Sequence, residues 1–329
     1  MCTAIRLVDK ECYFGRNLDV PFSYGEGIVL IPRKAPLSFR HEEEIKEHPA
    51  ILGMGLVQQG YPLLFDAMNE KGLSIAGLNF PGNAVYLPLA KDKRNLASFE
   101  WMNYALARFQ SVSEVKEFLK GCNFVDESFS KDLPSAPLHY LVSDSKESLV
   151  VEPTREGLKL YDNPYDVLTN NPPFPFHREN LKLYASLSPK ERKQGFSKDT
   201  PLPPFAAGFG TLGLPGDLSS PSRFVRTYYY LKTSLPKKTE EERVLSFLRI
   251  LSQVSFPEGS VQNKDGSREK TLYSSCMNLS RGTYSYRTLE SDDIRQVAFD
   301  DFDLEQEKVL FLNLERKPLV HRMRPAKHG

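Results

Sequence analysis

Segments predicted to be strands follow one another in groups along this chain, and groups of predicted helices separate them. The order of these groups constrains the fold more than any other feature. Short apolar segments bounded by turn residues are typical of strands, whereas apolar residues three and four positions apart indicate helices. Here a run of strands is followed by helices, then strands, then helices, and finally strands. Because strands and helices do not alternate one by one, the order argues against a parallel sheet built from βαβ units. The sequence therefore predicts an α+β fold.

The predicted strands are short, and several are joined by polar turns. Segments 3–7 and 12–16 flank the turn Val8-Asp9-Lys10-Glu11, so we expect them to pair as a hairpin. The segments from 139 to 169 are separated by turn residues and predict an antiparallel meander. In chain order the predicted strands are 3–7, 12–16, 27–31, 51–57, 73–78, 139–142, 149–152, 158–161, 167–169, 272–277, 283–287 and 309–314.

Helices are predicted at about 98–109, from 111, at about 221–232 and from 239. Ser111 with Glu114 and Thr239 with Glu242 have the spacing of a capping box, in which side chains and backbone amides of the first turn bond reciprocally. Ser220-Pro221 predicts a cap followed by a proline in the first turn of a helix. Arg223 would then lie in that first turn.

One long stretch has no apolar periodicity. Residues 187–204 are rich in proline and charge, which predicts a long loop that serves oligomer contacts or covers a substrate. No linker or internal repeat divides the remaining sequence, and 329 residues with 40% hydrophobic side chains suffice for a large core. We therefore expect a single domain over residues 1–329.

Charge and hydropathy argue against several classes of partner. Lys and Arg number 43 against 42 Asp and Glu, so no overall field attracts nucleic acid or an anionic membrane. The first 25 residues contain no signal-peptide core, and no apolar run approaches the length of a membrane span. Cys2, Cys12, Cys122 and Cys276 are far apart and form no C-x-x-C pair, which suits a reducing compartment. We expect a cytoplasmic protein without a nucleic-acid or membrane partner.

Two motif matches are set aside because their surroundings do not fit. Segment 208–213 matches G-x-G-x-x-G, but it follows a proline-rich loop instead of a strand and does not open a helix. Segment 41–44 lacks the second histidine of a zinc-binding helix, and no G-x-S-x-G elbow occurs. Dinucleotide, metal and serine-triad chemistry therefore have no anchor, and we expect no cofactor and no metal.

Cys2 is the first candidate for a catalytic group. Removal of the initiator Met1 would leave it at the N-terminus, where one residue carries both a thiol nucleophile and an α-amine base. A free α-amine has a pKa of about 7.7 to 8.0, so part of it is unprotonated at neutral pH. By position alone, a chance cysteine after Met1 is the simpler interpretation. The residues around Cys2 decide between the two.

The predicted hairpin brings charged residues to Cys2. If its turn is short, Cys2 pairs within a step or two of residues 16–18, and Arg16 and Asp19 become its neighbours. A guanidinium near a thiol favours the thiolate, and a carboxylate can hold the terminal amine. An ordinary surface ion pair explains the same two residues equally well.

Asparagines at two predicted strand ends can supply the donors that an oxyanion needs. Asn79 ends one strand, and Asn170-Asn171 follow another. Side chains and backbone amides next to such turns often point into a cleft. Asparagine beside glycine or proline is also common turn chemistry, which leaves both interpretations open.

Five segments carry a joint pattern: MCTAIR at 1–6, YFGRNLDVPFSYGE at 13–26, NEKGLSIAGLNFPG at 69–82, VLTNNPPF at 167–174 and GLPGDLSSPSRFVR at 213–226. Any one of them is weak evidence, but five in the same order are specific. Together they resemble the choloylglycine hydrolase family of N-terminal nucleophile hydrolases, and most closely its bile salt hydrolases. The resemblance runs along the whole chain.

The resemblance implies a four-layer αββα sandwich in which Cys2 is the nucleophile and its own amine is the base. The matching positions for catalytic residues are Cys2, Arg16, Asp19, Asn79, Asn170 and Arg223. Asn79 and Asn170 match oxyanion-hole residues, and Asn170 is preferred to Asn171 because related acylases look like T-N-S-P here. The family is commonly a homotetramer, with a loop similar to residues 187–215 contacting a neighbouring subunit.

The activity implied is cleavage of the amide bond of glycine- or taurine-conjugated bile salts through a thioester on Cys2. Asn79 favours bile salts, because penicillin V acylases of the family tend to have tyrosine there. The steroid contacts implied are Leu18, Val20, Phe22 and Leu133, for which ordinary core packing is the alternative.

Two other functions are compatible with parts of this pattern. A penicillin V acylase or N-acyl-homoserine lactone acylase would share the catalytic centre and differ in the shape of the pocket. A non-catalytic binding protein could retain the fold, although the complete set of matching residues argues against it.

Overall fold

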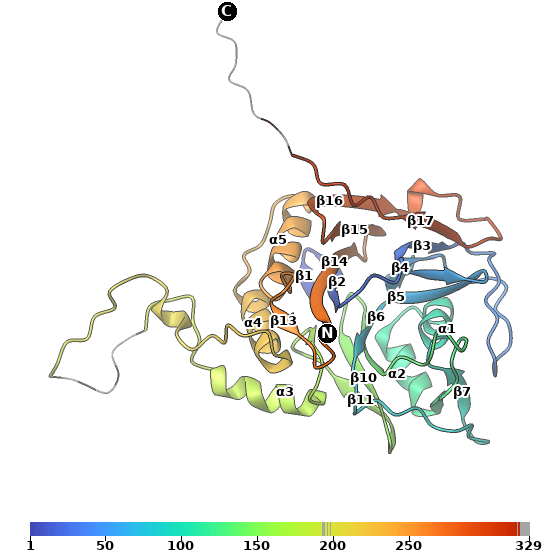
Figure 1. Ribbon diagram of the computed structural model, residues 1–329, viewed down its shortest axis with the longest axis horizontal. Coiled ribbons are helices and arrows are strands. Elements are labelled where there is room, and N and C mark those ends of the chain that lie inside the picture. Colours follow the sequence, from blue (N-terminus) through green and yellow to red (C-terminus); the bar gives the residue numbers. More distant parts are fainter. Residues whose placement is uncertain (193–194, 196, 198, 321, 323–329) are drawn as a thin grey trace, which may run out of the picture.

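A computed structural model gives the fold and describes residues 1–192, 195, 197, 199–320 and 322. Over these residues the chain forms two large antiparallel sheets that pack face to face, with helices on their outer sides (Figure 1). This arrangement confirms the α+β class and the αββα layering expected from the sequence.

The first sheet has seven strands and contains both strands of the predicted hairpin. Its main path runs β12-β1-β2-β14-β15-β16, and β13 pairs with β14. The strands are β1 (Cys2–Asp9), β2 (Glu11–Val20), β12 (Val167–Leu168), β13 (Val261–Gln262), β14 (Arg268–Asn278), β15 (Thr283–Thr288) and β16 (Ser291–Ala298).

The second sheet has eight strands in the order β11-β10-β9-β6-β5-β4-β3-β17. These are β3 (Gly27–Ile31), β4 (Ile51–Gln58), β5 (Tyr61–Asn69), β6 (Ser74–Asn79), β9 (Leu138–Ser143), β10 (Ser148–Thr154), β11 (Gly157–Asp162) and β17 (Leu310–Asn313). A short parallel pair, β7 (Arg94–Ala97) and β8 (Cys122–Val125), lies apart from both sheets.

The apolar side chains of the eight-stranded sheet divide between two cores. Successive strand residues point to opposite faces, so Ile28 and Leu30 of β3 face the seven-stranded sheet while Val29 and Ile31 face the helices on the other side. Helices α1 (Trp101–Arg108) and α2 (Val112–Lys120) complete this outer core. Strands covered on both faces are apolar almost throughout, which explains why these segments were easily recognised in the sequence.

Helices α4 (Ser220–Thr233) and α5 (Glu240–Ser252) cover the outer face of the seven-stranded sheet, and α3 (Phe174–Leu181) packs against α4. The capping boxes predicted at Ser111 and Thr239 are both present. The cap predicted at Ser220 is wrong by one residue, because Ser219 precedes the helix and Ser220 is its first residue.

Several elements differ from their sequence predictions for physical reasons. Residues 167–168 do not continue the meander but pair with β1 in the other sheet. Strand β5 was missed because it contains Pro62 and the buried polar Asp66. Strand β16 was missed because it alternates with exposed polar residues at the edge of its sheet. The predicted helix at 98–109 begins only at Trp101.

The predicted loop 187–204 belongs to a longer segment that projects from the body (Figure 1). We call residues 187–215 the arm; residues 193, 194, 196 and 198 of it lie outside the described part of the chain. The G-x-G-x-x-G match falls in the arm and forms the short 3-10 helix Phe209–Thr211. None of the helices among the described residues has the length and apolar character needed to cross a bilayer.

Candidate active site

Cys2 begins β1 on the side that faces the other sheet. It pairs with Leu18 of β2, and its side chain is 2% exposed. Met1 extends the same ladder, since its carbonyl accepts a hydrogen bond from the Asp19 amide at 2.9 Å. The hairpin predicted from the sequence is therefore confirmed, with Cys2 placed opposite the residues that were expected.

Arg16 lies two residues before Leu18 on β2, so it projects from the same face as the Cys2 side chain. Its Nη2 donates to Cys2 Sγ, and its Nη1 donates to the carbonyls of Phe65, at 3.2 Å, and Gly77. Burial alone would lower the pKa of this guanidinium, but the groups around it, Cys2 first among them, hold the pKa above its ordinary value. A permanent cation therefore contacts the thiol.

Asp19 is also buried but contacts a different part of the site. Its Oδ1 accepts from Thr271 Oγ1 at 2.5 Å, while Oδ2 has no hydrogen-bond partner among the described residues. Burial raises the pKa of this carboxyl, and the opposing effects of Arg223 and the N-terminal ammonium do not cancel the rise. The backbone carbonyl of Asp19 accepts from the Met1 ammonium. Asp19 thus lies at the chain terminus, whereas Arg16 lies at the thiol.

Arg223 links α4 to the start of β1. It is fully buried, and its Nη1 donates to the Cys2 carbonyl at 2.6 Å and to Thr3 Oγ1. Its Nη2 donates to Asn170 Oδ1 at 2.7 Å. Burial lowers the pKa of its guanidinium, against the opposing effects of Asp19 and Cys2. The first turn of α4 therefore fixes the backbone at Cys2.

Asn170 joins the two predicted oxyanion segments to the nucleophile. Its Oδ1 accepts from the Cys2 amide at 2.8 Å, and its Nδ2 donates to the carbonyl of Asn79 at 2.6 Å. Asn171 instead donates to the carbonyl of Pro81. Of the two asparagines, Asn170 is the one whose side chain contacts Cys2. Asn79 contacts this network through its backbone carbonyl.

The four predicted substrate contacts occupy different surroundings. Leu18 and Val20 are buried between the sheets, Phe22 is 57% exposed, and Leu133 is half-buried in a turn. The Phe22 ring lies 5.0 Å from that of Tyr24.

Tyr24 connects this aromatic group to the nucleophile. Its ring lies 5.8 Å from that of Phe65, whose carbonyl accepts from Arg16. Its pKa is raised by burial and, next, by the proximity of Cys2. An exposed aromatic surface at Phe22 therefore leads inward to the nucleophile.

A buried carboxylate next to Arg16 was not found from the sequence. Asp66 of β5 is fully buried and accepts from three hydroxyls of the opposite sheet, those of Tyr273, Ser275 at 2.8 Å and Tyr284 at 2.7 Å. Burial raises the pKa of this carboxyl, and Arg16 is the first of the groups that oppose the rise. A charged residue within an apolar strand was the available signal.

A β-bulge positions the neighbouring residue of β5. Met54 pairs with Asp66 and Gly55 pairs with Leu64, which leaves Phe65 as the extra residue. Bulges bend a strand and redirect its groups, and they are frequent beside active sites. The Phe65 carbonyl is one of the two that hold Arg16 Nη1.

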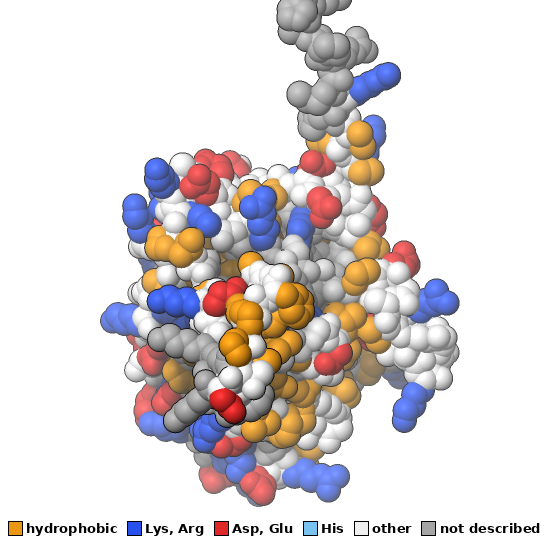
Figure 2. All heavy atoms as spheres, turned by 90° about the vertical axis from the view of Figure 1, so that its left-hand side faces the viewer, with side chains coloured by type: hydrophobic (Ala, Val, Ile, Leu, Met, Phe, Trp, Pro, Cys, Tyr) orange, Lys and Arg blue, Asp and Glu red, His pale blue; other side chains and the backbone are white. Residues whose placement is uncertain are grey.

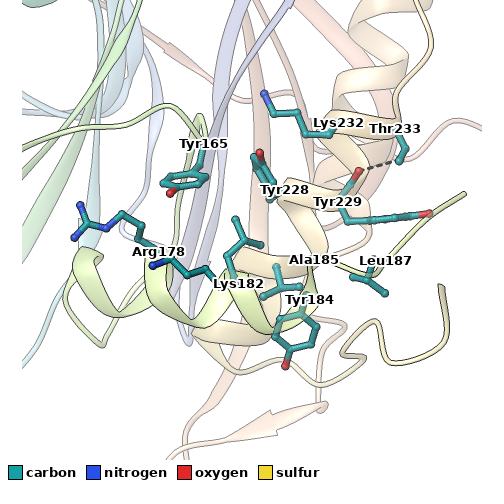
Figure 3. A pocket seen from close by; sticks show the side chains of 12 residues that line it. Tyr165, Arg178, Lys182, Tyr184, Ala185, Leu187, Tyr228, Tyr229, Lys232 and Thr233 are labelled. Carbon is teal, nitrogen blue, oxygen red and sulfur yellow. Dashed lines mark hydrogen bonds between the residues drawn. The ribbon is translucent and has the colours of Figure 1, made fainter. Parts of the chain in front are cut away.

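A hollow of about 360 Å³ lies outside this site, between α3 and α4 (Figure 3). Tyr165, Leu181, Val225 and Tyr228 line its apolar part, and Lys182 and Lys232 stand at its sides. None of its lining residues belongs to the predicted catalytic or substrate set. Within the described part of the chain, His, Cys, Asp and Glu side chains nowhere gather in threes, as a protein metal site would require.

Comparison with known proteins gives one consistent family. Residues 2–311 match the family model described as linear amide C-N hydrolases, choloylglycine hydrolase family. A bile salt hydrolase/transferase of Lactiplantibacillus plantarum is 45% identical over 310 residues, which cover 94% of this chain and 96% of that protein. A bile salt hydrolase/transferase of Clostridium perfringens is 36% identical, with 94% and 95% covered.

Solved structures agree with the sequence relatives. A variant of conjugated bile acid hydrolase from Clostridium perfringens superposes with a TM-score of 0.91 at 33% identity, covering 98% of this chain and all of that one. A penicillin V acylase from Agrobacterium tumefaciens gives a TM-score of 0.77 at 20% identity over 96% of this chain and 92% of its own. The second likeness extends to the fold alone.

Proposed function

Because the chain belongs to the choloylglycine hydrolase family of linear amide C–N hydrolases, we propose that it is a bile salt hydrolase that cleaves the amide bond of glycine- or taurine-conjugated bile salts. The observation that carries this proposal is the contact of a buried guanidinium, Arg16 Nη2, with the Sγ of Cys2 at the start of the first strand. The bile salt hydrolase relatives match nearly the full chain, which supports the substrate class.

The reaction begins when removal of Met1 frees the α-amine of Cys2. The Cys2 thiolate attacks the amide carbonyl, so a sulfur–carbon bond forms and the carbonyl oxygen becomes an oxyanion. Asn79 and Asn170 stabilise that oxyanion. The protonated α-amine gives its proton to the leaving glycine or taurine nitrogen as the carbon–nitrogen bond breaks.

Hydrolysis of the thioester completes the cycle. The α-amine, now neutral, takes a proton from water, whose oxygen bonds to the acyl carbon as the carbon–sulfur bond breaks. Arg16 stabilises the thiolate at both ends of this cycle, and Arg223 holds the Cys2 carbonyl. Asp19 holds the amine; its unpartnered Oδ2 supports this role.

The bile acid body is expected to contact Leu18, Val20, Phe22 and Leu133. The rings that lead from Phe22 through Tyr24 to Phe65 support an apolar entrance on this side. We further propose that the protein acts in the cytoplasm as a homotetramer whose arm contacts a neighbouring subunit. Phe205, which is 92% exposed, and Leu212, which is 64% exposed, support an arm that another copy covers.

The proposal is tested by measuring product release from glycocholate, taurocholate and penicillin V with reduced protein whose intact mass shows that Met1 is absent. Rapid cleavage of the bile salts with little cleavage of penicillin V is expected. The reverse preference would favour the acylase function with the same chemistry. Activity that persists in Cys2→Ala would eliminate Cys2 as the nucleophile.

The Cys2→Ser variant separates the thiolate step from the remaining chemistry. A hydroxyl is far less acidic than a thiol, so Arg16 cannot maintain it as an anion at neutral pH. We expect at least about a 100-fold loss of kcat on glycocholate, with an unchanged melting temperature. Near-normal turnover by the serine variant would contradict a thiolate nucleophile.

A further inference from the structure

His139 of β9 is fully buried and is not one of the predicted catalytic residues. Its Nε2 lies 2.9 Å from the carbonyl oxygen of Thr169. Because a carbonyl can only accept, this nitrogen carries a hydrogen. The other ring nitrogen, Nδ1, lies 3.4 Å from Glu152 Oε1. Both polar edges of the ring are therefore fixed.

The face of the same ring holds a second segment. The Phe80 ring stacks on His139 with centroids 4.2 Å apart and planes inclined by 5°. Phe80 directly follows Asn79, and Thr169 directly precedes Asn170. One imidazole therefore contacts the neighbours of both asparagines that are proposed to hold the oxyanion.

The two segments that His139 contacts come from different sheets. Phe80 continues β6 of the eight-stranded sheet, and its amide donates to the carbonyl of Pro137 at 2.7 Å. Thr169 continues β12 of the seven-stranded sheet. A side chain that contacts both segments determines the distance between them. It therefore also determines the distance between Asn79 and Asn170.

Neighbouring groups make this arrangement rigid. Glu152 Oε1, which faces His139, also accepts from the amide of Phe174 at 2.8 Å. His177 Nε2 donates to the carbonyl of Asn170 at 2.8 Å, and burial lowers the pKa of His177 to about 4, so this ring is neutral near pH 7. The carbonyls of Thr169 and Asn170 are thus each held by a buried imidazole.

We propose that His139 is a positioning residue for the oxyanion hole, which keeps the segments carrying Asn79 and Asn170 in register across the two sheets. This inference rests on the proposed function. Such a residue acts on the transition state, because the negative charge on the oxygen develops there and is absent from the bound amide. Its loss therefore lowers kcat and leaves KM and the reactivity of the Cys2 thiol almost unchanged.

Two substitutions separate positioning from packing. His139→Phe retains an aromatic ring against Phe80 but cannot donate to Thr169, whereas His139→Gln keeps a side-chain N–H that can reach the same carbonyl. Removing one oxyanion donor costs about 100- to 1,000-fold in kcat, so displacing two donors without removing them should cost about 10- to 100-fold. We expect that loss in His139→Phe and a partial recovery in His139→Gln.

His48 supplies a matched control. It is also a buried histidine whose two ring nitrogens contact carbonyls, those of Pro49 at 2.8 Å and Ala35 at 2.9 Å, but it contacts no residue of the site. His48→Phe should lower the melting temperature and leave kcat within about twofold of the unmodified protein. An equal loss of kcat in His48→Phe would make the effect of His139 one of general stability.

The experiment measures kcat, KM and the rate of Cys2 alkylation by iodoacetamide for these variants, on whichever amide the unmodified protein cleaves. A lower kcat with KM and alkylation within about threefold supports the proposal. Unchanged kcat, or parallel loss of kcat and alkylation, overturns it while leaving the proposed function intact. If His139→Phe does not fold, His139→Gln decides by the same criteria. If the unmodified protein cleaves none of the three amides, the proposed function and this inference both fail.

Discussion

Cys2 belongs to a buried cluster in which charges of both signs lie close together. Arg16 contacts its sulfur, Arg223 its carbonyl, and Asp66 lies behind Arg16. Charges interact strongly at low dielectric, so the stabilisation of an anionic Cys2 sulfur depends on the whole cluster and not on one arginine. The charged or titratable groups that surround it are the Met1 ammonium, Arg16, Asp19, Tyr24, Asp66, Arg223, Glu269, Tyr273 and Tyr284.

Asp66→Asn tests this balance at the scale of one residue. The Asp66 carboxylate partly offsets the positive charge of Arg16 at the thiol. The three backbone carbonyls that accept hydrogen bonds from the guanidinium remain when Asp66 is neutralised. Arg16 then stabilises an anion on Cys2 Sγ more strongly. In protein lacking Met1, we expect iodoacetamide to alkylate Cys2 up to about tenfold faster at pH 7 than in the unmodified protein.

The control for Asp66→Asn removes a buried carboxylate elsewhere. Asp144 Oδ2 accepts from the amide of Val112 at the start of α2, at 2.8 Å, and its Oδ1 accepts from the amide of Lys146 at 2.7 Å. Asp144→Asn should lower stability without changing the alkylation rate. An alkylation rate that is unchanged or lower in Asp66→Asn would mean that Arg16 does not retain its position without this carboxylate.

At the scale of elements, α4 matters because its first turn carries Arg223 into the site. The helix has no side-chain cap at Ser219, but Asp217 Oδ1 accepts from the Ser219 amide at 2.9 Å and its Oδ2 accepts from Ser222 Oγ at 2.6 Å. These bonds to Ser219 and Ser222 lower the pKa of Asp217 to about 2. A carboxylate at a helix N-terminus also interacts favourably with the helix dipole.

Asp217→Ala should therefore destabilise the protein in a pH-dependent way. A carboxyl whose pKa is lower in the folded than in the unfolded chain stabilises the fold above the unfolded value of 3.8, and this contribution is lost as the pH falls toward 2. Because the side chain is exposed and solvent screens it, we expect a loss of about 1 kcal/mol near pH 7. Denaturant unfolding at pH 7 and below pH 3 measures this; a difference that stays constant with pH would argue against a charged cap.

The elements also explain how far the sequence predicted the site. The β1–β2 hairpin is local and its turn is short, so the placement of Arg16 and Asp19 beside Cys2 followed from register alone. The contact of Asn170 with Cys2 depends on β12 pairing with β1 across a long stretch of chain, and periodicity predicted the wrong partner for β12. The strand-end position indicated Asn170 and Asn171 together, and the family resemblance selected Asn170.

Other parts of the site leave no readable signal in a single sequence. Asp66 lies on a strand interrupted by proline and a bulge, and its three hydroxyl partners come from the far end of the chain. His139 resembles any residue of an apolar strand until Thr169 and Phe80 are placed around it. Local patterns predict elements, whereas contacts between the sheets require the assembled fold.

At the scale of the whole molecule, the arm carries large apolar side chains that a single copy leaves exposed. Figure 2 views the face from which the arm projects, and hydrophobic side chains gather on this face beside it. Phe205 and Phe209 stack edge to face within the arm, with centroids 4.7 Å apart, yet Phe205 remains 92% exposed. Helices α3 and α4, whose residues line the apolar hollow, lie on the same side of the body as the arm (Figure 1).

The proposed tetramer predicts the effect of removing this apolar surface. Burying a phenylalanine or leucine side chain in a contact contributes about 1.5 to 3 kcal/mol, so a double Phe205→Ser and Leu212→Ser substitution should weaken each arm contact about a hundredfold or more. Light scattering after size-exclusion chromatography should give four times the 37.4 kDa chain mass for the unmodified protein and a lower mass for the double variant.

Val8→Ser is the matched control for the arm, because Val8 is 55% exposed and belongs to β1 of the β1–β2 hairpin, outside the arm. It should leave the tetramer intact. An unmodified protein that remains monomeric would remove the tetramer from the proposed function, and a double variant that remains tetrameric would assign the contact to another surface. Because the proposed catalytic residues all come from one chain, we expect the separated subunits to retain measurable cleavage of glycocholate. The melting temperature of the double variant shows whether each subunit is still folded.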